Sequence, residues 1–195
     1  MKYPIEQHKE IPTECMSCSV MGCGGKKDPA EDYGTLYAFY GTAQDRNQAS
    51  FGLALTKAGE GKKILFYSFI KKEEEGMDAI LEQIPAVNHV PTLPTKRFAF
   101  MMEEGEKEEA KKSNEQKLEE LFALSKEYDM LVLNDVFYAI SMGILEEEKL
   151  VGCLRTRPQH LDVVMTGKEA PEKILSMAEY VTKLEQIRHP KFVFE

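Results

Sequence analysis

The sequence predicts an α/β fold, in which a mostly parallel sheet carries helices on both faces. Two observations lead to this prediction. Short apolar runs alternate with segments of helical character over most of the 195 residues, which indicates βαβ units. Glycine and proline, the residues that most often end strands and helices, mark many of the boundaries. We expect one α/β domain over residues 34–195, preceded by a cysteine-containing appendage at residues 1–33.

The first half of the chain supplies two strands and two helices. The run LYAFY at residues 36–40 lies between glycines and suits a strand buried on both faces. A helix is expected over residues 47–57, because Gly59 follows and ends it. The run KKILFYSFI at residues 62–70 is rich in apolar and aromatic residues and predicts the second strand. The segment GMDAILEQI at residues 76–84 predicts the second helix.

The second half begins with a segment that proline interrupts. Pro91 and Pro94 forbid a regular central strand, so a loop over the sheet edge is expected, with only a short extended piece before Pro91. A long helix is predicted over residues 103–128, and the run MLVLND at residues 130–135 predicts a strand. The remaining predicted elements are a short helix ending within residues 151–158, a strand at 162–167, a helix at 170–181 and a last strand at 182–187.

Composition and charge exclude several classes of function. Hydrophobic residues make up 43% and charged residues 30% of the chain, and no apolar run approaches the roughly 18 residues that a membrane helix needs. The start of the sequence lacks the apolar stretch of a secretory signal, so a cytoplasmic location is expected. The formal charge of −8 argues against nucleic acid as a partner, because phosphate backbones are held mainly by Lys and Arg.

Polar residues follow three of the predicted strands. In a parallel sheet ligands collect at the carboxyl ends of the strands, so residues 41–48, Asn134 with Asp135, and residues 166–168 are expected along one rim. The first of these segments opens like a phosphate-binding loop, although it lacks the GK[ST] ending of that motif. Asp135, at the end of its strand, suits either a helix N-cap or a metal ligand.

Three stretches resemble one family, the P-loop ATP:corrinoid adenosyltransferases, which transfer the 5′-deoxyadenosyl group of ATP to the cobalt of a reduced corrinoid. YDMLVLNDVFYAISMGIL and LRTRPQHLDVVMTGKEAPEKILSMAEYVTKLEQIRHP are similar to a family pattern of YDLVVLDELNYAL, RPxH, TGR, AP, VTEM and KHP. GLALTKAGEGKKILFYSFIK is similar to the family's GLALRAAGHGKKVxxxQFIKG. The resemblance implies a RecA-like P-loop fold, often a homodimer, with ATP, Mg²⁺ and a corrinoid as ligands.

The phosphate loop departs from the family pattern, which is similar to TGDGKGKTT. Ala43 and Asp45 replace glycines, Arg46 stands for the lysine, and Asn47 and Gln48 stand for the two threonines. The negative charge of Asp45 disfavours binding of a triphosphate, because like charges about 4 Å apart repel by roughly 1 kcal/mol in water and more in a partly buried site. The loop residues that the resemblance implies for nucleotide binding are Gly41, Thr42, Ala43, Gln44, Asp45, Arg46, Asn47 and Gln48.

The resemblance also implies metal and corrinoid positions. The family's Asp-Glu pair, which helps to hold Mg²⁺, is represented by Asn134 and Asp135, so Asp135 is the Mg²⁺ candidate. RFAF, which ends in Phe98 and Phe100 around an alanine, stands where the family has an aromatic motif similar to GFTW near the corrinoid. These two rings suit either a corrinoid face or core aromatics beneath a loop. Two further family positions, His160 and His189, are expected to have structural roles.

A cysteine cluster lies before the α/β domain. Cys15, Cys18 and Cys23 form a CxxC pair with a third thiol close by, a spacing that suits zinc or an iron–sulfur cluster. A CxxC pair in a cytosolic protein also suits dithiol redox chemistry, and an absence of function is the remaining alternative. His8 or Cys153 are candidates for a fourth ligand.

Three hypotheses for the function follow. The chain is an adenosyltransferase that tolerates Arg46 and Asn47, or a non-catalytic module of the same fold that binds a corrinoid or a related ligand and has given up ATP. In the third hypothesis it is a zinc or iron–sulfur protein whose α/β domain is a dimerising scaffold. ATP binding separates the first hypothesis from the other two.

Overall fold

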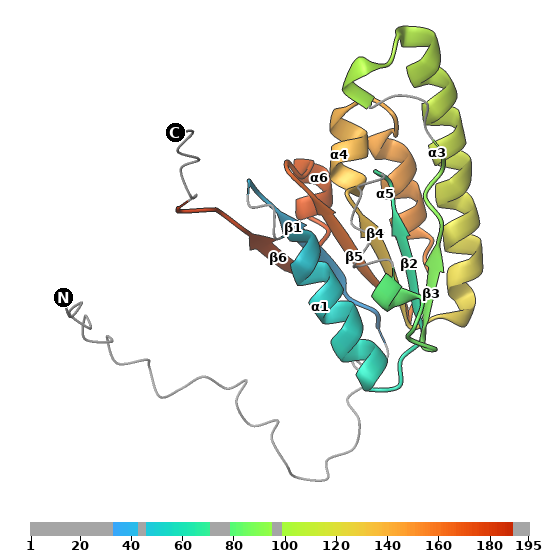
Figure 1. The fold of residues 1–195 in the computed structure, drawn as a ribbon, viewed down its shortest axis with the longest axis vertical. Helices are drawn as coiled ribbons and strands as arrows, with labels where there is room; N and C mark the ends of the chain where they lie inside the picture. The colour runs from blue at the N-terminus through green and yellow to red at the C-terminus, as the bar shows by residue number, and fades with distance from the viewer. Residues whose placement is uncertain (1–32, 43–45, 71–78, 95–98, 189–195) are drawn as a thin grey trace, which may run out of the picture. The chain divides into compact units, whose positions relative to one another are not determined.

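The computed structural model describes residues 33–42, 46–70, 79–94 and 99–188. They form one six-stranded sheet in the order β3-β2-β4-β5-β1-β6, in which every pair of neighbours is parallel (Figure 1). This arrangement confirms the predicted α/β fold and is consistent with a RecA-like P-loop type. The strands are β1 (Leu36–Tyr40), β2 (Ile64–Ser68), β3 (Val87–Val90), β4 (Met130–Asn134), β5 (Asp162–Gly167) and β6 (Tyr180–Lys183).

Helices cover both faces of the sheet. α1 packs on one face, while the apolar residues of α3 to α6 join the core cluster of the opposite face. Among the described residues, no helix has both the length and the apolar character needed to cross a bilayer. The helices are α1 (Arg46–Gly59), α3 (Glu104–Leu124), α4 (Val136–Ser141), α5 (Glu147–Arg155) and α6 (Glu172–Leu175), with 3₁₀ turns η3 (Ala99–Met101) and η4 (Ser125–Glu127).

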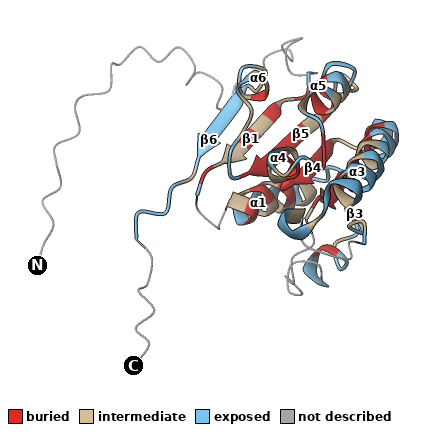
Figure 2. Cartoon of the chain, turned by 90° about the horizontal axis from the view of Figure 1, so that it is seen from above, coloured by how far each residue is buried: buried red, intermediate tan, exposed pale blue. Residues whose placement is uncertain are grey.

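The central strands are apolar at successive positions because side chains on both of their faces are buried. In β2, Ile64 and Phe66 join the cluster beneath α1, while Leu65 and Tyr67 join the cluster beneath α3 to α6. Burial raises the pKa of the Tyr67 hydroxyl to about 12. Burial differs between the centre and the edge of the sheet: β4 and β5 are buried, whereas the edge strand β6 is exposed (Figure 2).

Three elements differ from the sequence prediction. The short extended piece before Pro91 is an edge strand, β3, paired with β2. The six-residue helix α4 was not predicted, because its sequence continues the apolar character of β4. β6 begins at Tyr180, within the segment expected to be helical, because Tyr180 pairs with Tyr37 of β1 and stacks on its ring at 5.1 Å between centroids. This tertiary pairing overrides the local helical pattern.

Arg157 and His160, which belong to the segment that resembles the family's RPxH motif, lie at the amino ends of the strands, away from the predicted rim. Arg157 donates hydrogen bonds from its guanidinium to the carbonyl oxygens of Leu154 and Gly34, each at 3.0 Å. His160 Nε2 lies 3.1 Å from the carbonyl oxygen of Tyr128. These contacts support the structural role predicted for His160, whereas His189 lies outside the described residues.

Candidate functional site

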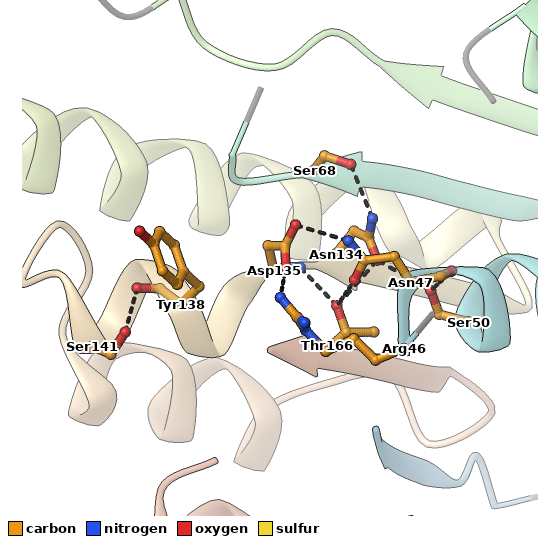
Figure 3. Close-up of polar contacts among 9 residues, drawn as sticks. All are labelled: Arg46, Asn47, Ser50, Ser68, Asn134, Asp135, Tyr138, Ser141 and Thr166. Atoms are coloured by element: carbon orange, nitrogen blue, oxygen red, sulfur yellow. Dashed lines mark hydrogen bonds and ion pairs between the residues drawn. The ribbon is translucent and has the colours of Figure 1, made fainter. Parts of the chain in front are cut away.

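Three segments that are far apart in the sequence meet at the carboxyl ends of the strands (Figure 3). The first turn of α1 brings Arg46 and Asn47, the end of β4 brings Asn134 and Asp135, and β5 brings Thr166. All but Arg46 are buried, and they are joined by direct hydrogen bonds. The rim predicted from the parallel sheet is therefore present at these positions.

The Asp135 carboxylate contacts two side chains at the start of α1. Arg46 Nη2 lies 3.2 Å from Asp135 Oδ1, and Asn47 Nδ2 donates a hydrogen bond of 2.9 Å to Asp135 Oδ2. The Asp135 side chain is 2% exposed and that of Arg46 is 11% exposed, so this ion pair is shielded from solvent. Both carboxylate oxygens therefore have donors from the start of α1.

The backbone at Asp135 explains where its side chain points. Asp135 has φ 54 and ψ 24, the left-handed conformation that Asp and Asn adopt more readily than most residues. It occupies the N-cap position of α4, yet its side chain makes no capping hydrogen bond and faces α1 instead. Its backbone N–H donates to Thr166 Oγ1 at 2.8 Å. The position is that of an N-cap, but the side chain serves another contact.

Two hydroxyl groups complete the network. Thr166 Oγ1 lies 2.9 Å from Asn47 Oδ1 and 3.1 Å from Asn134 Oδ1, and its single proton is directed to Asn47 Oδ1. Ser50 Oγ lies 2.8 Å from the Asn47 carbonyl oxygen and 3.1 Å from Asn134 Oδ1. Sequence reasoning placed Thr166 on the rim without a role and missed Ser50. The signal for Ser50 was its spacing, three residues after Asn47 and so on the same face of the helix.

Gly41 is required by packing at the end of β1. It has φ 130, and a Cβ added there would lie 2.1 Å from the carbonyl oxygen of Leu184. Its backbone N–H lies 3.0 Å from the carbonyl oxygen of Lys168, so the predicted loop begins beside the segment that follows β5. Thr42 and Gln48 are exposed. Three other nucleotide-binding candidates, Ala43, Gln44 and Asp45, lie outside the described residues.

The oxygen atoms at this rim do not fit Mg²⁺. The ion prefers six oxygen ligands at 2.0–2.1 Å in octahedral geometry. Here the side-chain oxygens of Asp135, Asn47 and Asn134 all accept hydrogen bonds from protein groups. The Asn47 amide also presents Nδ2, with its partial positive charge, to the one carboxylate of the network. Within the described ranges, no group of three or more His, Cys, Asp or Glu side chains is placed to hold a metal ion.

The corrinoid candidates are only partly described. Phe98 lies outside the described residues. Phe100, on η3, is 63% exposed and its neighbour Met101 is 57% exposed, whereas Ala99 and Met102 pack against the core. η3 directly precedes α3, whose first residues lie beyond the carboxyl ends of the strands (Figure 1). Phe100 is therefore a surface aromatic and not a core residue beneath a loop.

The cysteine cluster remains a prediction. Cys15, Cys18 and Cys23 lie outside the described residues, as does His8. Cys153 lies on α5 and is half-buried, and burial raises the pKa of its thiol. A raised pKa keeps the group protonated at neutral pH, whereas metals bind the thiolate.

Comparison with known proteins gives a family match. The family model described as ATP:corrinoid adenosyltransferase BtuR/CobO/CobP matches residues 32–192. The corrinoid adenosyltransferase CobA of Salmonella typhimurium is 26% identical over 160 residues, which cover 82% of this chain and 80% of that protein. A corrinoid adenosyltransferase of Pseudomonas aeruginosa is 22% identical over 160 residues, which cover 82% of this chain and 78% of that protein.

One relative is much longer than this chain. An uncharacterised protein of Nostoc sp. is 25% identical over 175 residues, which cover 81% of this chain but only 45% of the Nostoc protein. The match to that protein therefore spans less than half of its length. The similarity to the bacterial adenosyltransferases extends over most of both chains.

Proposed function

The chain belongs to the ATP:corrinoid adenosyltransferase family, which matches it over residues 32–192, and on that premise we propose that it binds a corrinoid but transfers little adenosyl group from MgATP. One observation carries the proposal. Both oxygens of Asp135, the carboxylate of the described hydrogen-bond network, are held by donors of the protein, Arg46 and Asn47. The group expected to hold Mg²⁺ is already engaged.

The chemistry of the family reaction explains why this engagement matters. The reduced cobalt of the corrinoid is itself the nucleophile that attacks the ribose 5′ carbon, so the protein supplies no nucleophilic side chain. Its tasks are to position the two substrates and to stabilise the charge that develops on the leaving triphosphate. Mg²⁺ would supply part of that stabilisation when bound. Arg46 is paired with Asp135, so little of its positive charge is left for a phosphate group.

Corrinoid binding is supported by membership of the family and by an exposed aromatic side chain on η3. Phe100, 63% exposed, offers a flat apolar face of the kind that packs against a macrocycle. Met101 beside it is 57% exposed and adds an adaptable apolar side chain. A corrinoid that covers both residues would remove apolar surface from water, which is favourable in proportion to the area buried.

Replacement of Phe100 by alanine is expected to weaken corrinoid binding about tenfold, because a buried aromatic contact is worth roughly 1–2 kcal/mol. The measurement is an anaerobic titration of the full chain with cob(II)alamin, followed by its visible spectrum. Tyr33→Ala is the matched control, since Tyr33 is equally exposed at 63% but precedes β1 at the opposite end of the strands. Failure of the wild-type protein to bind a corrinoid would contradict the proposed function.

Active adenosyl transfer is the second candidate function. It is favoured by the cation that Arg46 keeps at the start of α1 and by the glycine at position 41, both at the positions of a phosphate-binding loop. In this alternative, ATP would draw Arg46 away from Asp135 and the pair would open on binding. An adenosyl-transfer assay with reduced corrinoid separates the two candidates.

Two finer points belong to the same proposal. The family resemblance implies a homodimer, which light scattering of the purified chain would test. Cys15, Cys18 and Cys23 are proposed to hold zinc or an iron–sulfur cluster. A visible absorption band after anaerobic purification would indicate a cluster, whereas a colourless protein that contains zinc would indicate a zinc site.

A further inference from the structure

The orientation of the Asn47 side chain is fixed by its two partners. Its Nδ2 donates to Asp135 Oδ2 at 2.9 Å, and its Oδ1 accepts from Thr166 Oγ1 at 2.9 Å. The reverse orientation would place the amide oxygen against the carboxylate oxygen, with no proton between two acceptors. The amide oxygen of Asn47 is therefore directed to Thr166 and away from Asp135.

The neighbouring side-chain oxygens of Asn134 and Asp135 also accept hydrogen bonds from protein donors. Asn134 Oδ1 accepts from Ser50 Oγ at 3.1 Å, and it lies 3.1 Å from Thr166 Oγ1, whose single proton is directed to Asn47 Oδ1. Asp135 Oδ1 accepts a hydrogen bond from Arg46, and the positive charge of the guanidinium balances the negative charge of the carboxylate. A divalent cation placed here would have to displace these donors, and it would meet the amide hydrogens of Asn47 on the way to Asp135 Oδ2.

We infer that Arg46 and Asn47 replace a divalent cation as the partners of Asp135, and that the side chain at position 47 closes the metal position in this chain. Arg46 supplies the positive charge and Asn47 supplies the second contact. The inference rests on the proposed function for the identity of the site. Beyond that function, it names Asn47 as the residue that excludes the metal. In the absence of any ligand, the same contacts hold the start of α1 against the ends of β4 and β5.

A single substitution is expected to reopen the position. Asn47→Thr removes the amide donor and puts a hydroxyl oxygen, a possible cation ligand, next to Asp135. Mn²⁺ is a suitable probe because it accepts oxygen ligands and its free form is measured by electron paramagnetic resonance. The wild-type protein is expected to leave the Mn²⁺ signal unchanged, and Asn47→Thr is expected to bind Mn²⁺ at least about tenfold more tightly.

Controls assign any gain to this site. Asn47→Thr combined with Asp135→Asn must lose the gained Mn²⁺ binding. Asn114→Thr is the matched control for removal of a buried amide, since Asn114 donates to the Ile144 carbonyl oxygen at 3.0 Å and takes no part in the rim network. It is expected to bind no more Mn²⁺ than the wild type. If Asn47→Thr does not fold, as judged by circular dichroism, Asn47→Ser carries the same test with a smaller hydroxyl side chain.

Two results would overturn the inference. One is Mn²⁺ binding by the wild-type protein that is lost in Asp135→Asn. The other is a folded position-47 variant that gains no Mn²⁺ binding. Corrinoid binding is read separately from the visible spectrum, so a protein that excludes Mn²⁺ and also fails to bind a corrinoid would contradict the proposed function alone.

Discussion

Adenosyl transfer from MgATP to a reduced corrinoid is expected to be at least about 100-fold slower with this protein than with the Salmonella typhimurium corrinoid adenosyltransferase. The reason is electrostatic. Loss of one preorganised group that stabilises developing charge typically costs about 10²–10³ in rate, and here the metal position is closed while Arg46 is paired with Asp135. The measurement is the rate of adenosylcorrinoid formation under anaerobic conditions with saturating reductant.

The interpretation of this rate depends on two comparisons. Corrinoid binding must be shown for the same preparation, so that a slow rate is not a failure to bind the acceptor. The reaction is then repeated with excess chelator in place of Mg²⁺, and the small residual rate is expected to be unchanged. A rate close to that of the Salmonella protein, and dependent on Mg²⁺, would establish the active-enzyme alternative.

Replacement of Asp135 by alanine is expected to lower the free energy of unfolding by about 3 kcal/mol, since removal of one partner of a buried ion pair typically costs about 3–5 kcal/mol. For a chain of this length the loss corresponds to a fall in Tm of roughly 6–12 °C. Asp135→Asn keeps the size and suits the left-handed backbone, so it is expected to cost less, about 1–2 kcal/mol. Thermal unfolding followed by circular dichroism gives both values.

Asp129→Ala is the control for this comparison. Asp129 accepts a hydrogen bond from the Lys63 backbone N–H at 2.8 Å and pairs with Lys62 at 3.3 Å, but its side chain is 37% exposed. Contacts of this exposed kind contribute up to about 1 kcal/mol. If Asp135→Ala destabilised the protein no more than Asp129→Ala, the buried pair with Arg46 would not hold α1 to the strand ends.

The sequence predicts the fold best where local pattern and tertiary structure agree. β1, β2, β4 and β5 were predicted because two buried faces require an apolar residue at nearly every position. The start of β6 was not, because Tyr180 is held in the sheet by Tyr37, which is 143 positions earlier in the chain. No local pattern carries that information.

The candidate site divides in the same way. A general property of parallel sheets, that their carboxyl ends share one edge, was enough to bring Asn47, Asp135 and Thr166 together. The contacts themselves were not predicted, because Arg46 and Asp135 are 89 positions apart and their pairing depends on how α1 packs on the sheet. The sequence left Asp135 as an N-cap or a metal ligand, whereas its side chain contacts Arg46 and Asn47, for which the resemblance implies the positions of the family's Lys and Thr.

Calorimetric titration of MgATP into the anaerobically purified full chain tests the central claim most directly. With Asp135 held by Arg46 and Asn47, we expect no binding tighter than about 1 mM in a protein that circular dichroism shows to be folded. Micromolar binding of MgATP that is weakened by Arg46→Ala would contradict the claim, because it would show that the altered loop still holds the triphosphate and its metal.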